Sequence, residues 1–224
     1  MQTVLCLLAI SGASAATAAD TMGQRMKACV ACHGQEGRAT SEAFFPRIAG
    51  KPAGYLYNQL VNFRDGTRQN GTMAYLLDHM SDQYLREIAG YFASLELPYP
   101  PPQTTNAAAA KLARGEQLVR HGDASRGIPA CASCHGAAMT GVAPAIPGLL
   151  GLSRDYLLAQ FGGWRNGSRR AAAPDCMGEI ARRLSAQDVS AMAVWLSSQP
   201  VPPGASPAVS LPREAAMECG SGLR

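Results

Sequence analysis

Apolar residues recur at helical spacing in several stretches of the chain. Over 82–95 they form one helix face, and Ser81 before this stretch is a suitable N-cap. The same spacing returns over 186–198, where Ser185 and Asp188 form a capping-box pattern. Three further helices are predicted, over 54–64, 107–120 and 155–165. No stretch alternates between apolar and polar residues as a half-buried strand does, so the pattern predicts an all-α fold.

The helical pattern occurs twice. The segment YLYNQLVNFRDGTR at 55–68 matches YLLAQFGGWRNGSR at 156–169, and residues 73–95 match 177–199. Upstream, the alignment pairs Pro46, Ile48 and Gly50 with Pro144, Ile146 and Gly148. The chain is therefore predicted to be a tandem duplication of a unit of roughly 90 residues, which is an ordinary size for a small domain.

Proline-rich stretches mark the domain limits. LELPYPPPQTTNAAAA at 95–110 cannot be a continuous helix and favours an extended spacer, and PVPPGASPAVSLP at 200–212 follows the second repeat. The predicted parts are an N-terminal domain at 20–96, a linker at 97–106, a C-terminal domain at 107–199 and an extension at 200–224.

The first 19 residues are typical of a secretory signal peptide. A short apolar run from Val4 to Ile10 is followed by small residues that end at Ala15 and Ala18. A retained anchor is the alternative, but the run is shorter than the roughly 20 apolar residues that span a bilayer. No other segment of the sequence has the character of a membrane span. We therefore expect removal of this segment and export to the periplasm, where disulfides form.

Two pentapeptides carry the chemistry: CVACH at 29–33 and CASCH at 131–135. Cys-x-x-Cys-His places two thiols for thioether bonds to haem vinyl groups beside a histidine that ligates the iron. A four-thiolate zinc site leaves both histidines without a role, and a redox-active dithiol needs a βαβ context. Aromatic residues make up only 6% of the chain, and a porphyrin in each half would complete a thin core. The prediction is two covalently bound haems c, one on Cys29 and Cys32 with His33, the other on Cys131 and Cys134 with His135.

The repeat selects the second axial ligands. Met73 and Met177 are equivalent in the repeat alignment. Met73 is followed seven residues later by Met80 and then Ser81, and Met177 is followed seven residues later by Leu184 and then Ser185. Met80 aligns with Leu184 and is predicted to be a core residue. The two spare histidines, His79 and His121, have no counterpart in the other half and are predicted to lie in loops or on the surface. Histidine and methionine together fill both axial positions of each iron, which favours electron transfer over catalysis.

Two cysteines remain once Cys6 leaves with the signal peptide. Cys176 and Cys219 form an even pair in an oxidising compartment, so a disulfide is the simpler interpretation. Direct ligation of iron by Cys176, next to Met177, is the alternative.

Charge adds little to this picture. The net charge is +4, and the chain has no run of lysine and arginine, which argues against nucleic acid as a partner. Arg64 and Arg165 occupy equivalent positions in the repeats, so we predict that they contact haem propionates, because a guanidinium matches a carboxylate bidentately. Solvated arginines are the alternative.

The two CxxCH motifs, the repeated Tyr-Leu…Gln…Arg…Gly…Arg segment and the methionine-containing repeat resemble the dihaem cytochrome c4 family over about residues 21–199. The resemblance implies two class I cytochrome c domains whose haems approach through their propionate edges. It also implies close helix crossings at Gly23 against Tyr91 and at Gly115 against Trp195. The extension and Cys176 depart from the family pattern.

The resemblance implies a periplasmic electron carrier that is not an enzyme. Its donor would be a membrane quinol-oxidising complex or a dehydrogenase, its acceptor a haem–copper terminal oxidase, and it would associate peripherally with the membrane. An alternative is the electron-accepting cytochrome subunit of a periplasmic dehydrogenase, as in flavocytochrome c sulfide dehydrogenase. A further alternative is an autonomous haem enzyme, such as a thiosulfate dehydrogenase or a dihaem peroxidase, which needs an unusual or open coordination site.

Overall fold

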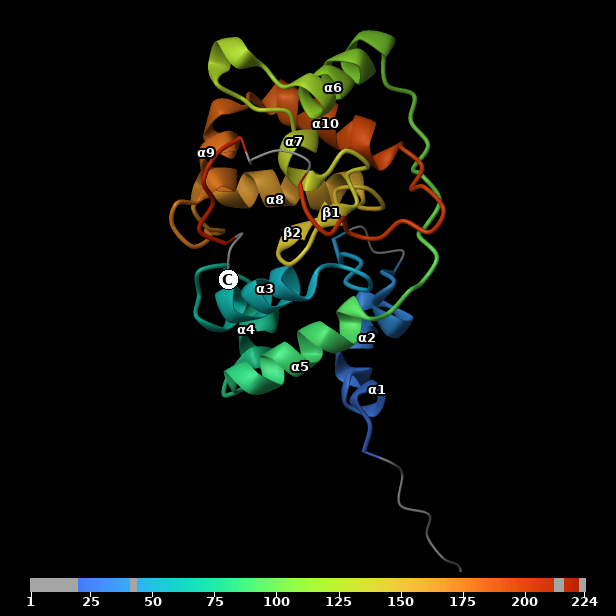
Figure 1. The fold of residues 1–224 in the computed structure, drawn as a ribbon, viewed down its shortest axis with the longest axis vertical. Helices are drawn as coiled ribbons and strands as arrows, with labels where there is room; N and C mark the ends of the chain where they lie inside the picture. The colour runs from blue at the N-terminus through green and yellow to red at the C-terminus, as the bar shows by residue number, and fades with distance from the viewer. Residues whose placement is uncertain (1–19, 41–43, 212–215, 222–224) are drawn as a thin grey trace, which may run out of the picture.

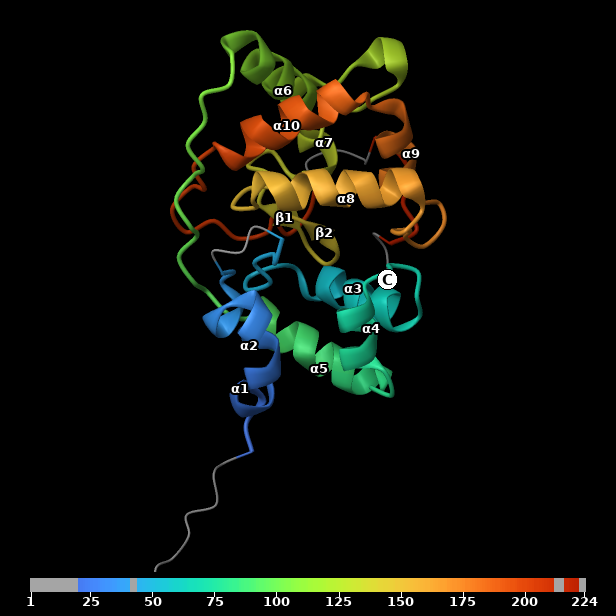
Figure 2. The ribbon, with the colours of Figure 1, turned by 180° about the vertical axis from the view of Figure 1, so that it is seen from behind.

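The computed structural model describes residues 20–40, 44–211 and 216–221, so the predicted signal peptide lies outside the described residues. Two helical halves are stacked along the long axis of the molecule, and an extended segment along one side joins them (Figure 1). The view from behind shows α3 of the first half directly beneath α8 of the second (Figure 2). The predicted all-α fold of two tandem domains is confirmed.

Each half contains the predicted helices in the predicted order. The first half has α1 (Met22–Arg25), α2 (Lys27–His33), the 3-10 turn η1 (Gln35–Gly37), α3 (Ala53–Arg64), α4 (Gly71–Leu77) and α5 (Asp82–Ala93). The second has α6 (Ala109–His121), η2 (Ala124–Arg126), α7 (Ala132–His135), α8 (Arg154–Asn166), α9 (Cys176–Arg183) and α10 (Ala186–Ser197). A two-residue hairpin, β1 (Gly141–Val142) with β2 (Ile146–Pro147), was not predicted, because such short strands leave no alternating pattern. The domain limits themselves stay predictions.

Serine caps begin the last helix of each half as predicted. The Ser81 hydroxyl accepts from the Tyr84 amide at the start of α5. Ser185 and Asp188 form a complete capping box at the start of α10. Each cap satisfies backbone donors that would otherwise have no partner, which typically contributes about 1 kcal/mol.

The first and last helices of the second half cross closely at Gly115. A β-carbon on this residue would lie 2.7 Å from Trp195 Cβ and would overlap the Ala191 carbonyl oxygen. In the first half, a β-carbon on Gly23 would lie 3.3 Å from the Tyr91 hydroxyl and would meet no backbone of the facing helix within 4 Å. Both predicted glycine contacts are confirmed, and the one at Gly115 permits two helix backbones to approach.

The structure corrects one part of the repeat alignment. Gly50 and Gly151 share a left-handed φ of 70° and 69°, and each stands shortly before a long helix. Pro144 lies in the turn between β1 and β2, whereas Pro147, the last residue of β2, directs its carbonyl to His135 Nδ1 as Pro46 does to His33 Nδ1. The pairs predicted for this segment were therefore wrong, and the structure matches Pro46, Ile48 and Gly50 with Pro147, Leu149 and Gly151.

The two halves meet through equivalent loops that follow α3 and α8. The Gln69 amide donates to the Ser168 carbonyl at 2.7 Å, and the Arg170 amide donates to the Thr67 carbonyl at 3.0 Å. Between these bonds, Arg68 and Arg169 face each other as an antiparallel bridge. The interface thus has an approximate two-fold arrangement that follows from the duplication.

Within the described part of the chain, no helix is both long enough and apolar enough to cross a membrane.

Gly115→Ala tests the helix crossing. Because the new methyl group meets backbone in a packed crossing, we expect it to lower the free energy of unfolding of the second half by about 1–3 kcal/mol. Gly162→Ala, in α8, is the control, since its β-carbon would have no atom within 4 Å. That substitution should be neutral or stabilise by up to about 1 kcal/mol. Denaturant unfolding of both variants measures the difference, and equal effects would contradict the crossing.

Candidate haem sites

The two pentapeptides lie at equivalent places in the halves. Cys29, Cys32 and His33 lie in the last turns of α2. Cys134 and His135 end the short helix α7, and Cys131 is its N-cap. Residues three and four apart in a helix share a face, so each pair of thiols and its histidine point to the same side.

Each histidine is oriented by a proline carbonyl from the following loop. His33 Nδ1 lies 3.0 Å from the Pro46 oxygen, and His135 Nδ1 lies 2.8 Å from the Pro147 oxygen. A carbonyl can only accept, so Nδ1 carries the proton and Nε2 keeps a free lone pair. Burial lowers the pKa of both imidazoles and outweighs the opposing effect of the carbonyl bonds. Both rings are therefore held in the neutral form that can ligate a metal.

The predicted methionine ligands lie in the first turns of two equivalent short helices. Asn70 caps α4 by accepting from the Met73 amide at 3.0 Å, and Asp175 caps α9 by accepting from the Gly178 amide at 2.9 Å. Met73 packs in the same apolar cluster as Cys29, and Met177 in the same cluster as Cys131. Each methionine is therefore fixed in the first turn of a helix whose N-terminus is capped by a side chain.

A deep cavity in the second half connects these groups. Its lining includes both thiols of the pentapeptide, His135 and Met177. Apolar side chains form most of the remaining wall: Ile128, Leu149, Leu157, Phe161, Met192 and Leu196. Polar residues of the first half close the side that faces the interface: Lys51, Tyr55 and Gln59. An apolar cavity with a polar side matches a porphyrin that carries two carboxylates at one edge.

A hydrogen-bonded layer of paired arginines, glutamines and tyrosines crosses the domain interface. Arg68 donates to Gln59 of its own half at 2.8 Å and to Gln160 of the other half at 2.6 Å. Arg169 donates to Gln160 at 2.7 Å and to Gln59 at 3.3 Å. Each guanidinium also donates to the tyrosine of the opposite half, Arg68 to Tyr156 and Arg169 to Tyr55.

This layer holds two buried cations without a matching anion. Arg68 and Arg169 are 9% and 8% exposed, and no carboxylate among the described residues pairs with either. Burial would raise the pKa of the Tyr156 phenol, but the two guanidinium groups outweigh it and lower that pKa to about 8. The indole Nε1 of Trp164, in the wall of the cavity, is buried without an acceptor. Buried charges and donors require partners, so the layer fits the propionate carboxylates of bound haem.

The arginines predicted for propionate contact are placed differently. Arg64 donates to Asp65 and to Asp82 at 2.8 Å each and to the Met80 carbonyl, and Arg165 is exposed. Arg68 and Arg169, four residues further along in each repeat, are the buried pair. Their signal in the sequence was the repeated glycine before them: Gly66 and Gly167 take left-handed φ angles of 76° and 79° and turn the chain back over its helix.

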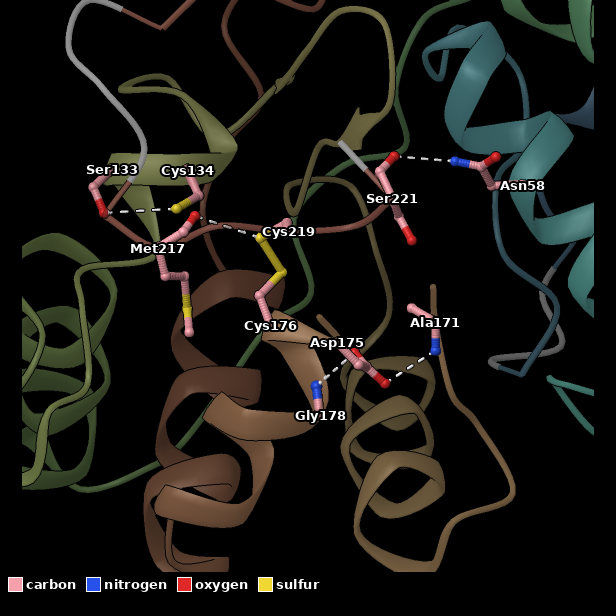
Figure 3. Close-up of a disulfide and its surroundings, with 10 residues drawn as sticks. All are labelled: Asn58, Ser133, Cys134, Ala171, Asp175, Cys176, Gly178, Met217, Cys219 and Ser221. Atoms are coloured by element: carbon pink, nitrogen blue, oxygen red, sulfur yellow. Dashed lines mark hydrogen bonds between the residues drawn. A yellow bond between two sulfur atoms is a disulfide. The ribbon is translucent and has the colours of Figure 1, made fainter. Parts of the chain in front are cut away.

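A disulfide holds the C-terminal extension against the second cavity. Cys176, the first residue of α9, is bonded to Cys219 of the extension, with a Cα–Cα distance of 5.3 Å (Figure 3). The Gly220 amide donates to the Pro174 carbonyl, and the Asn58 side chain of the first half donates to the Ser221 carbonyl at 3.1 Å. The predicted disulfide is confirmed, so Cys176 is not available as an iron ligand. Sequence reasoning did not foresee that the extension also bonds to the first half.

The duplicated fold, two CxxCH helices and a cavity built for a porphyrin define a c-type cytochrome with two haem-binding domains. No protein-family model matches the chain. It is 39% identical over 176 residues to a thiosulfate dehydrogenase electron acceptor of Thiomonas intermedia, covering 78% of this chain and 80% of the relative. It is 34% identical over 196 residues to cytochrome c4 of Pseudomonas aeruginosa, covering 86% and 94%. The crystal structure of reduced cytochrome c4 from Pseudomonas stutzeri superposes with a TM-score of 0.68 at 29% identity, over 79% of this chain and 95% of that one.

The chain therefore belongs to the dihaem cytochrome c4 family. It is an electron-transfer cytochrome with two covalently bound haems c.

The disulfide closes a loop of 43 residues next to Met177. Replacing both cysteines, Cys176→Ser with Cys219→Ser, should lower the free energy of unfolding by about 2–4 kcal/mol, because the unfolded chain loses a cross-link. Denaturant unfolding of haem-loaded protein measures the loss. As a direct control, the denatured wild-type protein should label no thiol before reduction and two after it. Two labelled thiols before reduction would rule the cross-link out.

Proposed function

We propose that His33 and Met73 ligate one haem iron and that His135 and Met177 ligate the other. Cys29 and Cys32 attach the first porphyrin, and Cys131 and Cys134 attach the second. The observation that carries this proposal is the cavity that brings Cys131, Cys134, His135 and Met177 together with a free Nε2 on the histidine. The first half supports it through the matching carbonyl contact of His33 and the packing of Met73 with Cys29.

The two haems supply one-electron redox chemistry, and the polypeptide decides what can reach them. With a histidine on one face and a methionine on the other, neither iron keeps a position for oxygen or a substrate. The apolar walls exclude water, and the capped helices α4 and α9 hold the methionines in place. The chain is therefore a carrier without a catalytic activity of its own.

The interface layer supplies side chains that would hold the carboxylate edges of both haems. We infer that Arg68, Arg169 and Trp164 bind propionate carboxylates, which would give the two guanidinium groups their missing anions. Because both arginines bridge the two halves, the carboxylate edges of both haems would lie at this layer, so an electron would pass between the halves there. Arg64 and Arg165 remain candidates only for contacts at the surface.

The physiological role that we propose is that of electron acceptor for a periplasmic dehydrogenase, with thiosulfate as the substrate of the partner. The support is the 39% identity to a thiosulfate dehydrogenase electron acceptor over most of both chains. The N-terminal segment supports export. We propose further that this cytochrome passes its electrons on to a haem–copper oxidase at the membrane surface.

Met73→Leu tests the axial assignment. Ferric haem with methionine sulfur bound has a weak far-red absorption band, and the variant should lose half of that band because only Met177 remains as a sulfur ligand. Met80→Leu is the matched control, since the repeat already has leucine at the equivalent position 184. It should keep the whole band. Loss of the band in Met80→Leu and its retention in Met73→Leu would reverse the assignment.

Mixing experiments test the role as acceptor. Oxidised cytochrome, a thiosulfate dehydrogenase and thiosulfate together should reduce both haems, as followed by their optical spectrum. Without the dehydrogenase, thiosulfate should reduce neither haem catalytically, because no coordination position is open. Turnover of thiosulfate by the cytochrome alone would show that it is an enzyme instead.

A further inference from the structure

Lys51 is a residue of the first half that lines the cavity of the second. It stands just before α3 and is only 9% exposed. The cavity it lines is the one whose wall includes His135 and Met177. The first half therefore contributes a cationic side chain to the site of the other haem.

The Lys51 ammonium has no partner that accounts for its burial. Among the described residues, none accepts a hydrogen bond from it, and no carboxylate forms an ion pair with it. The charged or ionisable groups that interact with it are Tyr156, Arg47 and His135, and none of them is a carboxylate. Burial is the main reason that the pKa of Lys51 falls to about 8 in the polypeptide alone. A buried ammonium is costly unless an anion or acceptor meets it, so the site implies an anion that the polypeptide does not supply.

The duplication places a different side chain at the equivalent position of the second half. With the alignment corrected by the structure, position 51 corresponds to position 152, which is Leu152. Leu152 is 8% exposed and lines the same cavity. The second haem site thus receives both a lysine from the opposite half and a leucine of its own.

We propose that Lys51 is a positioning residue for the second haem: it pairs with a propionate carboxylate of the porphyrin held by His135 and selectively raises the reduction potential of that haem. This proposal rests on the haem ligation proposed above. A fixed positive charge in a cavity of low dielectric constant favours the ferrous state, which carries one positive charge less than the ferric state. Because Lys51 comes from the other half, the packing of the two halves sets this potential.

The rest of the interface agrees with this role. Arg169 and Trp164 line the same cavity and offer further donors to the carboxylates, but Arg169 has its equivalent in Arg68 of the other half. Arg47 is committed elsewhere, since it donates to the carbonyl groups of Leu97 and Pro98 in the linker. Arg170, which aligns with Gln69, also lines the cavity but is exposed, so Lys51 is the buried cation of this site that has no cationic counterpart in the repeat.

An optical redox titration of the full, haem-loaded chain tests the proposal. Lys51→Leu reproduces the residue of the other repeat and should lower the midpoint potential of the second haem. We expect at least a threefold change in its ferric-to-ferrous ratio at a fixed potential, equal to about 28 mV from 59 mV per tenfold change for one electron. The first haem should change by less than a third of this shift. Each midpoint is assigned by adding Met73→His, which changes the ligand of the first haem alone.

Two variants complete the test. Lys51→Arg keeps the positive charge, so the midpoint potential of the second haem should stay at the wild-type value. A shift caused by altered packing alone would appear in this variant as well. Lys111→Leu removes an exposed lysine and should move neither midpoint. If Lys51→Leu fails to incorporate haem, the polar variant Lys51→Gln is judged by the same criterion.

The outcomes separate this inference from the proposed function. Two haems that both show methionine ligation, with midpoints that do not move or that move equally in Lys51→Leu, would overturn the role of Lys51 and leave the carrier function intact. Absence of two methionine-ligated haems in the wild-type protein would overturn the ligation on which both proposals rest.

Discussion

The packing of the two halves depends on two guanidinium groups, those of Arg68 and Arg169, that are buried at their interface. Arg68 and Arg169 share the side-chain oxygens of Gln59 and Gln160, so neither half can satisfy its arginine alone. Like charges at this separation repel, and the polypeptide offers them only neutral acceptors within its described residues. Anions between the two halves would therefore stabilise their docking. Bound haem would supply carboxylates there, which would couple cofactor binding to assembly of the two halves.

The duplication explains why so much of the site could be predicted from the sequence. CxxCH fixes thiols and histidine within one short helix, and the eight-residue spacing from Met73 and Met177 to the next N-cap serine is local. Local spacing survives into the structure because it depends on a few backbone hydrogen bonds. The carbonyl contacts of Pro46 and Pro147 with the two histidines were harder to predict from the sequence, because Pro144 lies nearby and was paired with Pro46 in the sequence alignment.

What the sequence could not show depends on contacts between the halves. Arg64 and Arg68 stand in the same repeated segment and look equally suited to a carboxylate. The difference is that Gly66 takes a left-handed turn and directs Arg68 into the interface, whereas Arg64 is held by Asp82 at the surface. Neither the burial of Lys51 nor the bond from Asn58 to Ser221 is encoded in a local pattern. Such long-range contacts appear only once both halves are packed.

In a duplicated electron carrier, electron transfer between the two haems has a preferred direction only if the surroundings of the two haems differ. If both haem sites had identical surroundings, their affinities for an electron would be equal and transfer between them would have no preferred sense. The differences here gather around the second site: Trp164 replaces Phe63, Lys51 has Leu152 as its counterpart, and the disulfide from Cys176 fastens the extension beside Met177. All three lie at or near the cavity wall, where a charge, a donor or a fixed ligand affects the iron most. The fold therefore keeps the proposed ligands of the two copies alike, and these three differences lie in the residues around the second site.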